Sequence, residues 1–151
     1  MIPASARLEL SVRSLDREVR DLLQARITTL VTAQAQSLGV QAHIDYKRDY
    51  PVLVNTYVET ELARQVGTEL LGAERVTRQG QPLTGSEDIA FMLEHSPGSY
   101  FMIGNGTGEG AGEGQPSHAC MVHNPGYDFN DDILPVGAAF WALLTQRYLK
   151  D

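Results

Sequence analysis

The sequence predicts an α/β protein made of two parts. Short runs in which apolar and polar residues alternate are typical of strands with one buried face, and longer runs with apolar residues every three or four positions are typical of amphipathic helices. The pattern also changes near residues 50 to 55, after which one run is apolar enough to be buried on both faces. We therefore expect a one-sided sheet layer covered by a helix, followed by a more deeply buried α/β layer.

Composition limits the class of protein. The chain has 151 residues and a formal net charge of -7, which disfavours binding to nucleic acid or to anionic membranes. No run of apolar residues approaches the roughly 18 of a membrane span. The N-terminus has no basic stretch followed by an apolar run, so the sequence does not indicate a signal peptide. A single cysteine, Cys120, excludes an internal disulfide and is expected to be a small buried apolar residue. These features predict a cytoplasmic protein.

The N-terminal part is predicted to contain a strand, a helix and a second strand. Residues 7 to 13 and residues 40 to 47 both alternate with period two. Between them lies an amphipathic helix, for which Asp16 is a suitable N-cap and Gly39 a suitable C-terminal stop.

The C-terminal part alternates helices with short strands. The pattern predicts two helices, the first ended by glycine and the second by Pro-Gly, with a short strand after each of them. An almost entirely apolar helix with Pro135 in its first turn comes last. In order these are a helix from Tyr57 to Gly72, a strand at residues 75 to 77, a helix capped by Ser86 and ended by Pro97 and Gly98, a strand at residues 100 to 103 that is buried on both faces, and a helix from about Asp132.

The segment His123-Asn124-Pro125-Gly126-Tyr127-Asp128-Phe129-Asn130-Asp131 is the strongest candidate for a functional site. It places a histidine and several carboxylates and amides on a Pro-Gly turn, where backbone geometry sets their direction. A catalytic zinc needs about three protein ligands, and the chain has no His-x-His or His-Glu-x-x-His pattern. From the residues alone His123 is either a metal ligand or an ordinary hydrogen-bonding histidine.

A glycine run from Gly104 to Gly114 contains Gly-Thr-Gly-Glu-Gly-Ala, formally a dinucleotide-binding fingerprint. Such a fingerprint opens a helix whose N-terminal amides bind a pyrophosphate, but no helical pattern follows this run. Glu109 and Glu113 would also repel phosphate. We expect a surface loop.

The other candidate residues have ordinary interpretations beside the functional ones. Glu87 and Asp88 are expected in the first turn of a helix, where a carboxylate interacts favourably with the helix dipole. His43 is expected on the exposed face of a strand, and His95 is near a helix end. His118, in the loop before the candidate site, fits either interpretation.

Four segments, taken in order, resemble one enzyme family. They are Ile2-Pro3-Ala4-Ser5-Ala6 through Val12-Arg13-Ser14, Tyr50-Pro51-Val52-Leu53-Val54-Asn55, Gly85-Ser86-Glu87-Asp88-Ile89-Ala90, and the segment from Met121 to Asp131. Pro97-Gly98-Ser99-Tyr100-Phe101 fits the same pattern. They are similar to hippurate hydrolase and to the wider group of dinuclear metallopeptidases that includes aminoacylase-type enzymes and plant auxin-conjugate hydrolases. Ile89 departs from the family, which usually has an aromatic residue there.

The resemblance implies a two-domain enzyme. A catalytic α/β domain would bind two divalent metal ions, zinc or manganese, and an inserted ferredoxin-like lid domain would mediate homodimerisation. His123 would then be the C-terminal metal ligand, Gly85, Glu87 and Asp88 would line the substrate pocket, and Asn55 would lie near the lid hinge.

The resemblance also implies that much of the enzyme is missing. Residues 1–53 would be the back half of the lid, and residues 54–151 the C-terminal part of the catalytic domain. The other metal ligands and the glutamate general base would precede Met1, so no catalytic residue is expected in this chain. A truncated or frameshifted reading frame, or a cloned piece, would each explain such a start.

The function implied is that of a C-terminal piece of a metal-dependent amidohydrolase acting on small N-acyl amino acids. We expect the piece alone to be inactive and not to retain metal. Dipeptides or auxin conjugates are alternative substrates, and a non-catalytic dimerisation or interaction module is an alternative role.

Two structural expectations complete this interpretation. The strands at residues 7 to 13 and 40 to 47 would not pair directly, because in such a lid both flank a strand that is missing here, and the chain would associate through them. His123 would lie at the surface, near a groove beside Glu87 and Asp88, with Asp128 and Asn130 as hydrogen-bonding partners.

Overall fold

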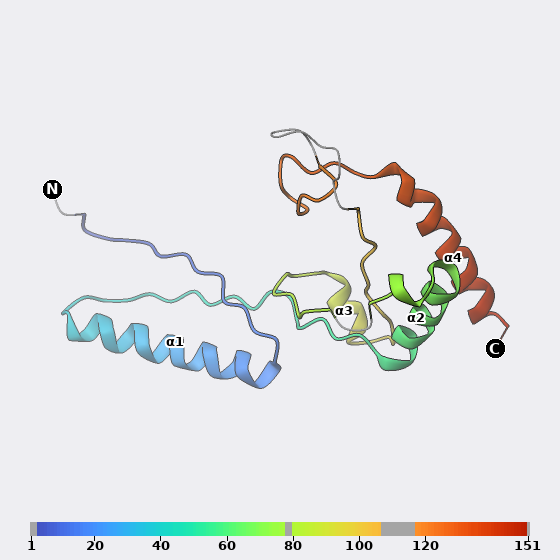
Figure 1. The fold of residues 1–151 in the computed structure, drawn as a ribbon. Helices are drawn as coiled ribbons and strands as arrows, with labels where there is room; N and C mark the ends of the chain where they lie inside the picture. The colour runs from blue at the N-terminus through green and yellow to red at the C-terminus, as the bar shows by residue number, and fades with distance from the viewer. Residues whose placement is uncertain (1–2, 78–79, 107–116, 151) are drawn as a thin grey trace. The chain divides into compact units, whose positions relative to one another are not determined.

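The computed structural model describes residues 3–77, 80–106 and 117–150 of the chain. Within these ranges the regular structure is helical, and no β-strand is formed. In order, the elements are α1 (Arg17–Ser37), α2 (Tyr57–Leu71), the 3₁₀ helix η1 (Ala73–Arg75), α3 (Ile89–Leu93), the 3₁₀ helix η2 (Asp131–Ile133) and α4 (Leu134–Tyr148) (Figure 1).

Contacts divide the chain into two compact units. The first unit contains Met1–Val54 and Gly80–Ser96, and the second contains Asn55–Gln79 and Pro97–Asp151. The segment Gly80–Ser96, which the sequence assigned to the catalytic part, therefore groups with the N-terminal unit. The division of the chain into a lid at residues 1–53 and a catalytic part at residues 54–151 stays a prediction.

Helix α1 of the first unit begins and ends as the sequence predicted. The Asp16 side chain accepts a hydrogen bond from the Val19 amide at 2.9 Å, which satisfies one of the free N–H groups of the first turn. At the other end Gly39 has a φ of 68°, and the amide of Val40 donates to the carbonyl of Ala35 at 3.0 Å. This is a Schellman ending, in which glycine adopts the left-handed conformation at little cost.

The strands predicted on either side of α1 are not formed. Residues 7 to 13 and 40 to 47 are irregular, and no β-bridge joins them. Leu8 and Leu10 are 87% and 81% exposed. Period-two alternation records which side chains require burial, but a strand also needs a hydrogen-bonded neighbour, and the described residues supply none.

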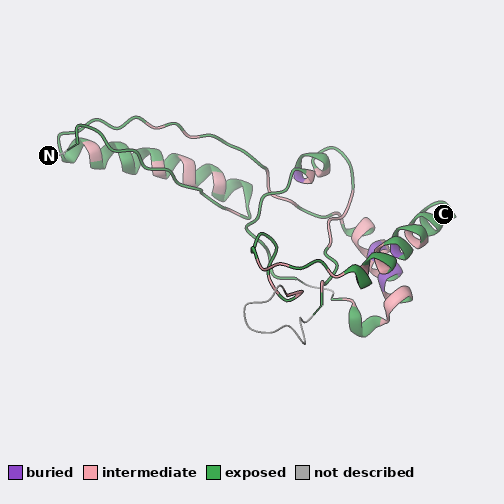
Figure 2. Ribbon diagram, turned by 90° about the horizontal axis from the view of Figure 1, so that it is seen from above, coloured by how far each residue is buried: buried purple, intermediate pink, exposed green. Residues whose placement is uncertain are grey.

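The first unit buries little apolar surface. Helix α1 has no buried residue, and Ala90 in α3 is the only buried hydrophobic residue among the described residues of this unit (Figure 2). Polar contacts link its segments instead: Arg48 binds Asp21 at 2.6 Å, and Arg17 binds Glu94 at 2.6 Å. Exposed pairs of this kind contribute about 0–1 kcal/mol each. Several large apolar side chains of α1 remain exposed, among them Leu22 and Leu30.

The second unit has a small core between α2 and α4. Val66 is 1% exposed and lies in the same cluster as Ala63 and Phe140. The ring of Phe101 packs on Phe140 at a centroid distance of 4.8 Å, which adds segment 100 to 103 to the cluster. The helix predicted from Tyr57 to Gly72 is confirmed as α2.

Arg64, on the face of α2 beside this core, forms a bidentate pair with Glu61 one turn earlier. The hydrogen bonds that Arg64 donates to the Glu61 carboxylate raise the pKa of the Arg64 guanidinium above its ordinary value. Arg64 is therefore charged at any physiological pH, and the pair is a feature of the helix surface.

Two further strand predictions are wrong. Residue 75 ends the 3₁₀ helix η1, and residues 76 and 77 are irregular. Residues 100 to 103 are also irregular, and Met102 is 67% exposed rather than buried on both faces. An apolar run of four residues indicates burial but does not specify the partner strands that would cover it.

Helix α3 is shorter than predicted and begins differently. Its N-cap is Asp88, without a side-chain cap bond, so Glu87 precedes the helix rather than lying in its first turn. Ser86 does not cap the helix and instead accepts a hydrogen bond from the Arg13 guanidinium. The last helix, α4, begins at Leu134 after η2 and has Pro135 in its first turn, as predicted.

Candidate functional site

The predicted site residues are divided between the two units. Asn55 and His123 belong to the second unit, whereas Gly85, Glu87 and Asp88 belong to the first. The predicted proximity of His123 to the segment of Glu87 and Asp88 stays a prediction.

The Asn55 side chain links the start of α2 to the segment after Pro97. Its Oδ1 accepts from the Tyr100 amide at 2.8 Å, and its Nδ2 donates to the Tyr100 carbonyl at 2.8 Å. The next residue, Thr56, donates through its amide to the Gly98 carbonyl at 3.0 Å. In the structure Asn55 thus joins two backbone segments, and its predicted role in substrate binding stays a prediction.

The segment around Gly85 is an exposed connection that Arg13 fastens. The Arg13 Nη1 atom donates to the Thr84 carbonyl at 3.2 Å and also to the Ser86 hydroxyl. A Cβ added at Gly85 would meet nothing within 4 Å. Glu87 and Asp88 are both exposed, so their carboxylates are accessible to a ligand.

His123 lies in a pair of consecutive turns. The Asn124 amide donates to the Met121 carbonyl at 3.1 Å, and His123, at the third position of that turn, has a φ of 68°. A positive φ at this position is that of a type II turn, which favours glycine or asparagine. His123 is exposed and is the only non-glycine residue with positive φ among those described. Such conformations are maintained by their surroundings and are frequent at functional sites.

The second turn contains the Pro-Gly pair that the sequence singled out. The Tyr127 amide donates to the Asn124 carbonyl at 2.9 Å, with Pro125 at the second position, where its fixed φ suits the turn. The Asn124 side chain reinforces it by accepting from the Gly126 amide at 2.8 Å.

These turns belong to a loop that closes on itself. The Ser117 amide donates to the Gly126 carbonyl at 2.9 Å, and the Ser117 carbonyl accepts from the Asp128 amide at 3.4 Å. An isolated parallel bridge joins Ser117 to Tyr127. We call residues Ser117 to Asp128 the closed loop; its two ends meet, as in Ω-loops.

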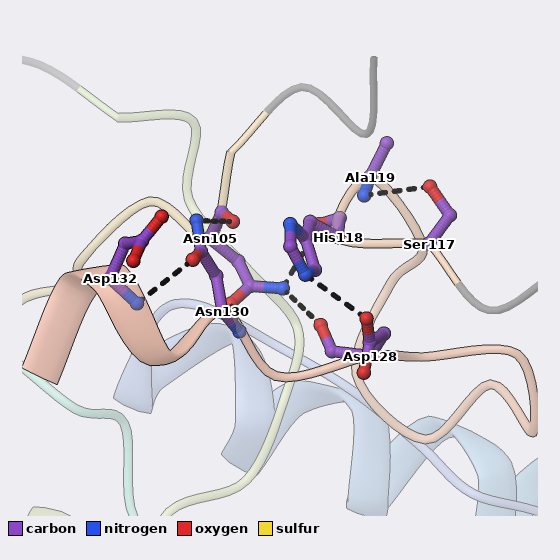
Figure 3. Close-up of polar contacts among 7 residues, drawn as sticks. All are labelled: Asn105, Ser117, His118, Ala119, Asp128, Asn130 and Asp132. Atoms are coloured by element: carbon purple, nitrogen blue, oxygen red, sulfur yellow. Dashed lines mark hydrogen bonds and ion pairs between the residues drawn. The ribbon is translucent and has the colours of Figure 1, made fainter. Parts of the chain in front are cut away.

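A polar network fastens the base of the closed loop to segment 100 to 106 (Figure 3). Asn105 donates from Nδ2 to the carbonyls of His118 at 3.1 Å and Asp128 at 2.7 Å, and its Oδ1 accepts from the Asn130 amide at 3.0 Å. In return, the Asn130 side chain donates to the Asn105 carbonyl at 3.1 Å and caps η2 by accepting from the Asp132 amide at 3.0 Å. A hydrogen bond of this neutral kind contributes about 0.5–1.5 kcal/mol.

A histidine and a carboxylate close the same base. His118 Nε2 lies 3.0 Å from Asp128 Oδ2, with the two side chains 35% and 51% exposed (Figure 3). Asp128 and Asn130, predicted as partners of His123, therefore bind His118 and Asn105 instead. The sequence-based assignment was wrong because proximity along the chain suggested His123, whereas closure of the loop brings His118 to Asp128.

Asn105 is the residue that sequence reasoning missed. It lies in the glycine run, which was expected to be a loop without a specific role. Residues 104 to 106 are indeed irregular, but residues 107 to 116 lie outside the described part of the chain, so the remainder of that prediction is not tested. The signal available in the sequence was the pair Asn105-Gly106, because glycine permits backbone conformations that most residues avoid. In the structure Gly106 has a φ of 108°.

The remaining candidates show no site. His43 and His95 are exposed, and Cys120 is half-buried rather than buried. A cavity of about 310 Å³ lies between α2 and α4, lined mainly by apolar residues including Leu62, Phe101, Trp141, Leu144, Tyr148 and Leu149. None of the predicted site residues lines it.

The metal ions implied by the resemblance can be tested against these residues. In the described ranges no three or more His, Cys, Asp or Glu side chains gather as a metal site. His123 is exposed and its imidazole is a suitable single ligand, but a single ligand does not make a catalytic metal site. The residues present therefore do not fit a dinuclear metal centre by themselves.

None of the described helices is long and apolar enough to cross a membrane.

Comparison with known proteins identifies the family. Residues 4–147 match Peptidase family M20/M25/M40. The chain belongs to this family. It is 30% identical over 150 residues to the hippurate hydrolase of Campylobacter jejuni, a match that covers 99% of this chain and 36% of that protein.

Two other relatives show the range of the family. An IAA-amino acid hydrolase of Arabidopsis thaliana is 29% identical over 157 residues, covering 100% of this chain and 34% of that protein. Thermostable carboxypeptidase 2 of Saccharolobus solfataricus is 26% identical over 149 residues, covering 98% and 35%. The chain thus spans about a third of the length of these relatives. No solved structure matches it significantly.

Proposed function

We propose that this chain is the C-terminal part of a metal-dependent amidohydrolase that cleaves N-acyl amino acids, and that His123 is the metal ligand it contributes. The observation that carries the proposal is the family match over residues 4–147, within which a relative named hippurate hydrolase aligns over 99% of the chain. The conformation of His123 supports its role, because an exposed histidine in a left-handed turn is presented by the backbone rather than by packing.

The site needs several ligands, and the described part of this chain does not bring them together. A neutral imidazole supplies one nitrogen lone pair to a metal ion, and the remaining ligands and the general base would come from protein outside these 151 residues. Asn55, Gly85, Glu87 and Asp88 are proposed to contact the substrate, and the exposure of the last two suits that role. The complete enzyme is proposed to act as a homodimer.

The experiment is an assay of the complete gene product. Hippurate, an N-acetyl amino acid, an auxin–amino acid conjugate and a dipeptide are offered separately, with and without a chelator. We expect hippurate or the acetyl amino acid to be hydrolysed fastest, and chelation and His123→Ala each to abolish turnover. His43→Ala is the matched control, because His43 is an exposed histidine in the other unit. Full activity of the His123 variant would reject the assignment.

A second role is favoured by one specific observation. Many large apolar side chains of α1 and its flanking segments are exposed, among them Leu10, Leu22 and Leu30, and no cluster of potential ligands occurs in the described ranges. For the polypeptide alone, this supports a non-catalytic dimerisation or interaction module. A complete gene product that dimerises but hydrolyses none of the four substrates would favour this role.

A further inference from the structure

We propose that Asn105 is a positioning residue that fixes the closed loop and thereby sets the conformation of His123. The functional consequence rests on the proposed role of His123 as a ligand, whereas the structural consequence is independent of it. The inference concerns a side chain from a different segment, 18 positions before His123 in the sequence.

Asn105 binds both ends of the closed loop. Its Nδ2 atom donates to the carbonyls of His118 and Asp128, the second and the last residue of the closed loop. One amide group therefore bridges both ends of the loop. The backbone bonds at Ser117 bring the ends together, and Asn105 fastens them to a separate part of the unit.

The attachment between Asn105 and Asn130 is reciprocal. Asn105 Oδ1 accepts from the Asn130 amide, while the Asn130 side chain donates to the Asn105 carbonyl. Asn130 also caps η2 through Asp132, so the loop base is continuous with the helix that follows. The side chain of Asn105 uses both of its N–H groups and its carbonyl oxygen, an arrangement that a residue of another shape cannot reproduce.

Gly106, which follows Asn105, packs closely against the base of the closed loop. A Cβ at Gly106 would lie 3.3 Å from Asn130 Nδ2 and 3.6 Å from His118 Cβ. A Cβ there would make an unusually tight contact with Asn130, and the φ of 108° at Gly106 is one that other residues rarely adopt. Asn105 and Gly106 together attach the base of the closed loop to segment 100 to 106.

The consequence concerns His123. Its left-handed conformation is unfavourable for a residue with a Cβ and persists only while the surrounding turns are fixed. Those turns lie within the closed loop, whose ends Asn105 fastens. Without Asn105 we expect the loop to open and His123 to sample ordinary negative φ values.

The test compares Asn105→Ala with Asn55→Ala in the complete 151-residue chain by NMR and hydrogen exchange. Asn55 is a matched control because it forms a similar two-bond amide link, to the backbone of Tyr100, in the same unit. In Asn105→Ala we expect the amides of Ser117 and Asp128 to exchange about tenfold faster or more. The Cα shift and amide–α-proton coupling of His123 should move away from left-handed values. Asn55→Ala should leave these signals unchanged.

Two outcomes overturn the inference. Unchanged exchange and unchanged His123 signals in Asn105→Ala would show that the backbone bonds alone fix the loop. Equal effects from Asn55→Ala would show that a general destabilisation of the unit, rather than loss of the bonds that Asn105 makes to the closed loop, causes the change. If Asn105→Ala releases the loop while His123→Ala leaves the complete enzyme fully active, the positioning role stands and the proposed function fails.

Discussion

At the residue scale, the irregular segments of the second unit are held by side chains that bind backbone. Asn105, Asn55 and Asn124 each use a short amide to join or tighten irregular segments. Because the described residues contain no sheet, these amides satisfy backbone groups that strands would otherwise pair. An irregular segment of this kind adopts a single defined conformation only where such side-chain bonds hold it.

Gly106 provides a test at this scale. Gly106→Ala would force a Cβ into a φ of 108° and to 3.3 Å from Asn130 Nδ2, so we expect a loss of about 1–3 kcal/mol in the free energy of unfolding of the second unit. Gly104→Ala is the control, because a Cβ there would meet nothing within 4 Å. Urea denaturation followed by circular dichroism measures both. Equal effects of the two variants would contradict the account of Gly106.

The candidate site was only partly predictable from the sequence. The turn of Pro125 and Gly126 was recognisable, because proline and glycine determine turns locally. The contact between His118 and Asp128 was not, since it depends on closure of the loop. Asn105 was missed for the same reason: its partners lie 13 to 25 positions away along the chain.

At the element scale, the three long helices were predictable, whereas the short helix α3 was only roughly placed and the strands were not predictable. The bonds of α1 and α2 join residues four apart, so Asp16, Gly39 and Gly72 mark their ends within the local sequence. A strand depends on a distant partner, and residues 7 to 13 and 40 to 47 have the alternation without the partner. The pattern indicates the surface that requires burial, not the structure it adopts in this chain.

Helix α1 is therefore expected to depend on its ends. It has no buried residue, so tertiary packing contributes little and the caps contribute much. Asp16→Ala should cost about 0.5–2 kcal/mol and fray the first turns, which lowers helicity measured by far-ultraviolet circular dichroism. Asp16→Asn keeps the acceptor oxygen and should retain the helicity. A loss of the same size in both variants would indicate that charge, rather than the cap bond, matters.

At the scale of the whole molecule, few apolar side chains are buried. Among the described residues the buried hydrophobic ones are Ala63, Val66, Ala90 and Phe140, whereas large apolar side chains such as Leu8, Leu10 and Leu30 are more than half exposed. We expect this exposed apolar surface to favour association.

Self-association is the expected result for the chain alone. The exposed Leu8 and Leu10 flank a helix without buried residues, and such surfaces associate in water. We expect light scattering to show dimers or larger species, and the double substitution Leu8→Ser and Leu10→Ser to shift the population toward monomer. Leu134→Ser, at an exposed leucine in the other unit, is the control. A monomer at all concentrations would refute this prediction.

The purified chain is also expected to lack amidohydrolase activity. In the described ranges no three potential ligands gather, and a lone histidine binds a divalent ion too weakly to retain it, because several ligands from separate segments normally share that task. Glu87 and Asp88 are not expected to act as general base, because without a bound metal ion there is no activated water for them to deprotonate. Incubation with hippurate and added zinc or manganese should give no turnover, and bound metal should be substoichiometric and removed by a chelator. Turnover that His123→Ala abolishes and His43→Ala preserves would mean that the chain, alone or as an oligomer, assembles a complete site. The two variants separate that result from a contaminating hydrolase, whose activity neither substitution would change.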